Sequence, residues 1–400
     1  MISVMQRQFL PYALLCRLGG CFFIPSFWKP LENAKVTWRS SYTAYAAFAV
    51  ASWFSVELTV IVKRCHIRSN LSYHDFPSLL LIILQATVSL KALLNFVTVA
   101  TGSSGLVKFF KKASVFEKTT GFFPSSRCAR GVWRQRWSFL RRFFVVQGIV
   151  STYVFSTLLS SVSLTAELPD NFGFLGKIGA VLTGMYYLLY DVFPYIVLSS
   201  CSSVLVAYLQ AQVKIFERCC RFGAVHNEMH LSQQLEVIRH NLGGIRDLKH
   251  SLNAIWEAPL VAMSAGVLLD VCVVFYAIFH DGFFRSHVRV AVSYCLYSSF
   301  AFMDMACISQ ALTDEAQKLK DATKAAYTFA ATHGYVQQLR YLHETIDPDE
   351  MCLSGAGFFR LNKSLLVSMA GTIITYTVIL SQTSDGLVNK AGPRNETQLG

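Results

Sequence analysis

The stretch that decides the fold is LNKSLLVSMAGTIITYTVILSQ, which runs from Leu361 to Gln382 near the C-terminal end of the sequence. An apolar run of about 20 residues is long enough to cross a lipid bilayer as an α-helix. A helix turns by about 100° per residue, and at that step the small and polar residues of this run fall into one narrow stripe. The stripe comprises Ser364, Ser368, Gly371, Thr375 and Gln382, whereas Leu366, Met369, Ile373 and Leu380 lie on the opposite surface.

Such a stripe has two interpretations. Small residues let membrane helices approach closely, so the stripe is consistent with a seam between packed helices. It is also consistent with the wall of a water-filled pore, in which Val378 and Ile379 form an apolar interruption. Apolar rings of that kind gate channels by dewetting. Under the second interpretation the pore-lining residues are Ser368, Gly371, Thr375, Val378, Ile379 and Gln382.

The residue order within this segment also resembles the signature of a known family. Thr375 and Tyr376, five mostly apolar residues and Gln382 resemble the C-terminal signature of the arthropod gustatory receptors, which reads Thr-Tyr, five hydrophobic residues, Gln and Phe. The preceding Gly-Ala-Gly-Phe-Phe-Arg-Leu is also similar to that family. Thr383 stands where the family usually has Phe. The match is specific between residues 352 and 382 and rests elsewhere on the pattern of spans.

The resemblance implies a plasma-membrane receptor in sensory neurons that opens a non-selective cation channel when a small-molecule tastant binds. It implies homo- or heterotetramers with seven spans per subunit and a central pore lined by the seventh helix. It also implies a cytosolic layer of helices and a ligand pocket in the outer half of each subunit. No cofactor and no enzymatic activity are implied.

Composition agrees with a membrane protein. The 400 residues are 53% hydrophobic and only 15% charged, which is not the balance of a soluble enzyme. The net charge of +12 does not indicate nucleic acid binding, because the basic residues cluster beside apolar spans. The 11 cysteines form no Cys-x-x-Cys pair, and His226 and His230 lack the residue order of a zinc helix. We therefore expect no disulfide framework and no metal site.

The apolar runs predict a single all-α domain with seven spans and polar helical extensions. A long basic loop is predicted between the second and third spans, at 101–142, and charged cytosolic helices are predicted at 210–258 and 313–350. The spans lie at about 42–62, 77–100, 143–164, 178–206, 259–280, 290–312 and 364–383.

Charge distribution sets the expected orientation. If the N-terminus is cytosolic, the segments outside the predicted spans that lie on the cytosolic side hold 27 Lys and Arg, and those on the extracellular side hold 8. The positive-inside rule therefore predicts a cytosolic N-terminus and an extracellular C-terminus. The sequons at Asn70 and Asn395 then lie outside, and Asn395 is the expected glycosylation site because Asn70 is close to the membrane.

A G-protein-coupled receptor is the alternative for a chain with seven spans. The predicted orientation is the reverse of that class. The sequence also lacks an Asp-Arg-Tyr after the third span and an Asn-Pro-x-x-Tyr in the seventh.

Charged residues inside the predicted spans are the remaining candidates for function, because such groups usually face the bundle interior or a cavity. They also occur as structural ion pairs, and the sequence leaves both interpretations open. The set is Glu57, Lys91, Asp191, Asp270 and Asp304. Aromatic faces around one charge suit a small ligand. We therefore predict a ligand pocket lined by Tyr186, Tyr187, Tyr190, Asp191, Tyr276 and Tyr294.

Overall fold

The computed structural model describes residues 2–69, 76–122, 173–222, 228–281, 286–328 and 333–390, apart from 19, 21, 25, 26, 28, 32–35, 37 and 39. Some helical residues in these ranges have a described backbone only. The third predicted span and both sequons, Asn70 and Asn395, lie outside the described residues.

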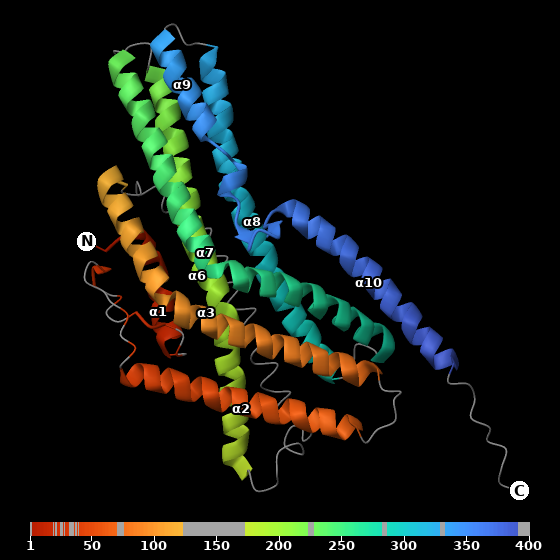
Figure 1. Ribbon diagram of the computed structural model, residues 1–400. Coiled ribbons are helices and arrows are strands. Elements are labelled where there is room, and N and C mark those ends of the chain that lie inside the picture. Colours follow the sequence, from red (N-terminus) through yellow and green to blue (C-terminus); the bar gives the residue numbers. More distant parts are fainter. Residues whose placement is uncertain are drawn as a thin grey trace, which may run out of the picture.

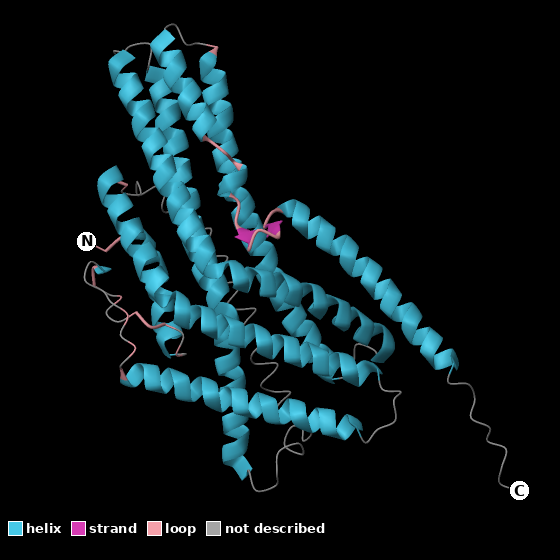
Figure 2. Ribbon diagram, in the orientation of Figure 1, coloured by secondary structure: helices cyan, strands magenta, loops and turns pink. Residues whose placement is uncertain are grey.

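The regular secondary structure of the described part of the chain is helical except for one small hairpin (Figures 1 and 2). The hairpin pairs β1 (Ser354–Gly355) with β2 (Phe359–Arg360) in antiparallel register and follows a 3₁₀ turn, η2 (Asp349–Met351). The helices are α1 (Val4–Leu18), α2 (Ser41–Ser69), α3 (Phe76–Thr120), α6 (Gly173–Phe222), α7 (Glu228–Asp281), α8 (Ser286–Tyr327), α9 (His333–Thr345) and α10 (Lys363–Lys390).

Helix α3 corrects one expectation. The basic segment predicted as a loop from residue 101 begins as a continuation of α3, which ends only at Thr120. The glycines at 102 and 105 lie inside the helix, where the absence of a side chain lets α7 approach closely. A β-carbon on Gly102 would lie 2.9 Å from Cγ2 of Ile255, which explains a residue without a side chain at this crossing.

Helix α7 joins two predicted elements into one. The charged helix predicted at 210–258 is divided: its first part, to Phe222, is the end of α6, and its part from Glu228 shares α7 with the span predicted from Pro259, which lies inside that helix. A proline inside a helix removes one backbone hydrogen bond but does not prevent continuation where packing holds both sides. The apolar stripe of the charged part is buried, at Leu235, Ile238, Leu242 and Ile245.

The core lies where α3, α6, α7 and α8 pack together. The N-terminal segment belongs to it: Phe9 and Phe27 pack against Phe110 of α3, and Phe22 packs against both of them. The carboxylate of Glu117 in α3 accepts hydrogen bonds from the first turn of α1, at the backbone nitrogens of Val4 (2.6 Å) and Met5 (3.0 Å). A negative charge at a helix N-terminus satisfies free N–H groups and the helix dipole, so α1 is fixed to α3.

Three described segments are long and apolar enough to cross a bilayer: Ala86–Thr120, Tyr190–Cys220 and Leu231–Ile278. A shorter apolar segment, Lys363–Ile379, begins α10.

Candidate functional site

Helix α10 lies at one edge of the molecule (Figure 1). It leaves the hairpin beside α8 and contacts α7 and α8. Its core-facing surface is apolar, with Leu365, Leu366 and Met369 packed against the main hydrophobic core. Leu366 and Met369 belong to the surface that the helical angles place opposite the polar stripe.

The polar stripe of α10 lies on the exposed side of the helix. Ser368, Gly371, Thr375 and Gln382 are all exposed, as is Ser364 at its start. The apolar neighbours of the stripe are exposed too, with relative accessibilities of 74% for Val367, 66% for Ile374, 53% for Tyr376 and 48% each for Val378 and Ile379. The described part of one chain therefore leaves the stripe and much of its apolar surroundings exposed.

The joint between α8 and α10 is held by side chains that bond to the backbone. The Leu353 N–H donates to Oγ of Ser309 on α8 at 2.8 Å, and the Ser354 N–H donates to Oδ1 of Asn253 on α7 at 2.9 Å. The Leu361 N–H closes the segment on the Leu353 carbonyl at 2.8 Å. The hairpin segment from which α10 starts is thus bonded to both helices that α10 contacts.

The hairpin itself needs two special backbone positions. Gly357 has a φ of 76° and Ala356 a φ of 48°, which form the turn between the strands. Gly355 is packed under the ring of Phe359, and a β-carbon there would lie 2.5 Å from Cζ of that ring. A tight turn covered by an aromatic ring therefore requires the Gly-Ala-Gly-Phe-Phe sequence found here.

A buried charged cluster joins three helices. Nζ of Lys91 on α3 lies 2.8 Å from Oδ1 of Asp191 on α6, and each side chain is only 5% exposed. The same ammonium donates to the Tyr294 hydroxyl on α8 at 2.6 Å, and that hydroxyl donates to Oδ2 of Asp191 at 3.1 Å. The three groups form a closed triangle, so Lys91 and Asp191 are an ion pair, one of the two alternatives open for charges in spans.

The tyrosines predicted around Asp191 lie in different surroundings. Tyr190 points away from the cluster: its hydroxyl donates to the Gly20 carbonyl at 2.8 Å, and its ring meets Phe96. Tyr276 is buried in a separate apolar cluster with Leu84 and Cys295. The side chains of Tyr186 and Tyr187 lie outside the described residues. Of the six predicted pocket residues, the structure therefore joins Asp191 and Tyr294.

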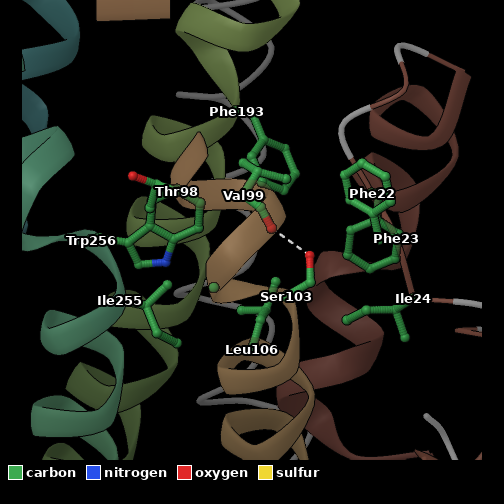
Figure 3. Close-up of a pocket in the computed structure, with 11 residues that line it drawn as sticks. Phe22, Phe23, Ile24, Thr98, Val99, Ser103, Leu106, Phe193, Ile255 and Trp256 are labelled. Atoms are coloured by element: carbon green, nitrogen blue, oxygen red, sulfur yellow. Dashed lines mark hydrogen bonds between the residues drawn. The ribbon is translucent and has the colours of Figure 1, made fainter. Parts of the chain in front are cut away.

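An apolar cavity lies elsewhere, between the N-terminal segment and α3, α6 and α7 (Figure 3). Phe22, Phe23 and Ile24 close one side, and Ile255 and Trp256 of α7 close another. The Ser103 hydroxyl in its wall is used within α3, where it donates to the Val99 carbonyl. No residue of the predicted pocket lines this cavity.

Sequence reasoning missed the partners rather than the charges. Lys91 and Asp191 were singled out as intramembrane charges, but nothing in the sequence paired them, because they are 100 residues apart on different helices. Ser298, which approaches Asp270, carried no signal of its own. Its spacing of four residues from Tyr294 places both on one face of α8.

Comparison with known proteins identifies relatives at two levels. A family profile described as "7tm Chemosensory receptor" matches residues 11–385. The gustatory receptor for sugar taste 64b of Drosophila melanogaster is 25% identical over 180 residues, which cover 44% of this chain and 42% of that receptor.

Solved structures agree on the fold. The insect olfactory receptor OR5 of Machilis hrabei in complex with eugenol is similar with a TM-score of 0.72 at 16% identity, covering 95% of this chain and 98% of that chain. A second structure of the same receptor gives a TM-score of 0.71 at 17% identity, covering 94% and 98%.

Proposed function

Because the chain belongs to the 7tm chemosensory receptor family, a family of multi-pass membrane receptors and not of enzymes, we propose that it is a gustatory receptor acting as a tastant-gated, non-selective cation channel. In this proposal the N-terminus is cytosolic and the C-terminus extracellular in the plasma membrane, with seven spans per subunit. The third span, at 143–164, is part of this proposal.

The observation that carries the proposal is α10. Many of its apolar and polar residues are exposed among the described residues, and the hairpin from which it starts is bonded to Ser309 and Asn253. A helix with a polar stripe cannot enclose a conducting path alone, so several copies must close a ring around it. We propose four copies, with Ser368, Gly371, Thr375 and Gln382 facing the axis and Val378 and Ile379 at the constriction.

The same helix weighs against a G-protein-coupled receptor. A receptor that works as one seven-helix bundle needs its last span packed into that bundle. Here Ile374 and Tyr376 of α10 are exposed by more than half.

For the ligand we propose a small organic tastant, in line with a sugar-taste relative and with an olfactory relative solved with eugenol. The proposed pocket is centred on Asp191 and Tyr294 and extends to Tyr186 and Tyr187, with Tyr190 and Tyr276 in the surrounding wall. Agonist binding would open the channel by its higher affinity for the open state. Currents recorded from cells that express this chain alone, across a tastant panel, test this directly.

The pore face is tested by cysteine substitution in a cysteine-depleted background. Gln382→Cys and Thr375→Cys should make the current sensitive to a water-soluble thiol reagent, because the proposal puts both side chains in the ion path. Met369→Cys is the matched control, since Met369 packs on the core of its own subunit. Block through Met369→Cys with Gln382→Cys untouched would contradict the proposed wall.

Assembly is tested on purified protein in lipid nanodiscs by native mass spectrometry. A tetramer is expected, alone or with a related subunit. A stable monomer that still responds to ligand would overturn the channel, because one α10 cannot enclose a pore.

A further inference from the structure

Asp270 of α7 is a buried carboxylate that the channel proposal does not use. Its side chain is 1% exposed, and its Oδ1 has no hydrogen-bond partner among the described residues. Its other oxygen, Oδ2, lies 3.5 Å from the Ser298 hydroxyl, at the outer limit of a hydrogen bond. A buried charge without a partner is costly. Oδ1 of Asp270 is an unsatisfied atom of this kind among the described residues, in the membrane part of the molecule.

Asp270 lies beside the Lys91 cluster. A β-carbon on Gly266, one turn before Asp270 on the same face of α7, would be 3.6 Å from Cδ of Lys91. The Lys91 ammonium reaches the Tyr294 hydroxyl, one turn before Ser298 on α8. Since α7 and α8 run in opposite directions, Asp270 and Ser298 lie at a level between Gly266 and Tyr294. The charges of Lys91 and Asp191 both act on Asp270.

The charge of this group is unbalanced. With both carboxylates ionised, one ammonium faces two aspartates, which leaves a net charge of −1 for Lys91, Asp191 and Asp270. Lys91 already spends two of its three N–H donors on Asp191 and Tyr294. The free Oδ1 of Asp270 and the Ser298 hydroxyl, which lies 3.5 Å from Oδ2 of the same carboxylate, are both hard oxygen ligands, and the missing charge is a single positive one.

We propose that Asp270 and Ser298 hold a small monovalent cation, Na⁺ in the first instance, between α7 and α8. The cation completes the charge of the cluster and satisfies the free oxygen of Asp270. It also ties α7 and α8 to the Lys91–Asp191 pair of α3 and α6, so four helices meet around one ion. The site does not depend on whether the chain conducts current.

The test is a stability titration of the full-length chain in lipid nanodiscs. NaCl is exchanged for N-methyl-D-glucamine chloride at constant ionic strength, and the melting temperature is read from tryptophan fluorescence. A ligand that binds only the folded state stabilises it progressively above its dissociation constant. The melting temperature should therefore rise with Na⁺ concentration. A melting temperature of the wild-type chain that does not change with Na⁺ would overturn the proposal. This is the result expected if the carboxyl of Asp270 simply carries a proton.

Three variants locate the site. Asp270→Asn should lose the Na⁺-dependent rise, because an amide lacks the charge that holds the ion. Asp304→Asn is the matched control in the same bundle and should keep the rise, since its carboxylate already accepts a hydrogen bond from Tyr195 at 2.8 Å. Lys91→Gln with Asp191→Asn removes the ion pair without changing the net charge and should also keep it. An Na⁺ response that survives Asp270→Asn would contradict the assignment.

Direct binding covers the case in which Asp270→Asn folds poorly. Radioactive ²²Na⁺ bound to the wild-type protein should reach one ion per chain and be displaced by unlabelled Na⁺. Asp270→Glu keeps the charge and should retain binding. Wild-type protein that is folded and binds no ²²Na⁺ would end the proposal.

Discussion

Helices α6 and α10 are both long and apolar, yet they solve the burial of their side chains in opposite ways. From Tyr190 to Leu205 nearly every residue of α6 is buried inside the chain. Over Lys363 to Ile379 most residues of α10 are exposed or half-buried. The apolar surface of α6 is used to build the subunit, whereas that of α10 remains for lipid or for another copy. Apolar composition alone does not distinguish the two roles.

The largest effect is expected from the charge pair in which α6 takes part. Lys91→Met leaves Asp191 buried without its counterion, and breaking a buried pair costs about 3–5 kcal/mol. The melting temperature of the purified protein should fall accordingly. The double variant Lys91→Met with Asp191→Leu should recover most of the loss, because no charge then remains unpaired. A single variant as stable as the wild type would mean that water reaches Asp191.

A matched pair of truncations breaks the comparison directly. Leu205→Ala on α6 removes a fully buried side chain and should destabilise the subunit by about 2–5 kcal/mol. Ile374→Ala on α10 removes an exposed side chain and should change subunit unfolding by no more than about 0.5 kcal/mol. Thermal unfolding measures both.

The same α10 variant sharpens the comparison when assembly is measured instead of unfolding. If α10 is covered by other copies, Ile374→Ala should increase the dissociated fraction in native mass spectrometry. Equal cost for both truncations in subunit unfolding would show that α10 belongs to the subunit core.

Effects of opposite sign are expected at two glycines, Gly355 in the hairpin and Gly371 inside α10. Gly355→Ala places a β-carbon 2.5 Å from the Phe359 ring and should destabilise the hairpin by about 1–3 kcal/mol. Gly371→Ala has open space around it and should stabilise α10 by up to about 1 kcal/mol, since alanine favours helix over glycine. The melting temperature of the isolated subunit should fall in Gly355→Ala and rise in Gly371→Ala.

Gly371→Ala also separates the two interpretations of the stripe. In a seam between packed helices the added methyl group obstructs close approach and should weaken the tetramer. In a water-filled pore the methyl group is accommodated, and the tetramer should be as stable as the wild type. Stability of the tetramer toward dilution is the measurement.

Much of the helical architecture could be predicted because it follows from local chemistry. The apolar runs and the positions of proline, glycine and charge predicted seven spans. Six of them lie in helices of the structure, and the third, at 143–164, lies outside the described residues. The 3.6-residue period also gave the two faces of α10, with Leu366 and Met369 inward and the small polar residues outward. The resemblance to gustatory receptors, based on residues 352–382, is confirmed by the family match over 11–385.

The site was less predictable because its contacts are distant in sequence. Asp191 and Tyr294 were both named for a pocket, but Tyr190 turned out to bond the N-terminal segment, which no spacing along α6 reveals. The helical continuation of α3 past residue 101 was also missed, because glycines at 102 and 105 resemble a loop until the approach of Ile255 is known.

The sequence by itself determined that this is a helical membrane chain with a polar-striped last helix, because hydrophobicity, helical period and motif wording are properties of neighbouring residues. Only the tertiary structure decided which charges meet. Lys91 pairs with Asp191 across 100 residues, and Oδ1 of Asp270, one turn from Gly266, has no partner among the described residues. The physical reason is that burial raises the cost of any unpaired charge, so the pairing depends on which helices pack together and not on the order of residues along the chain.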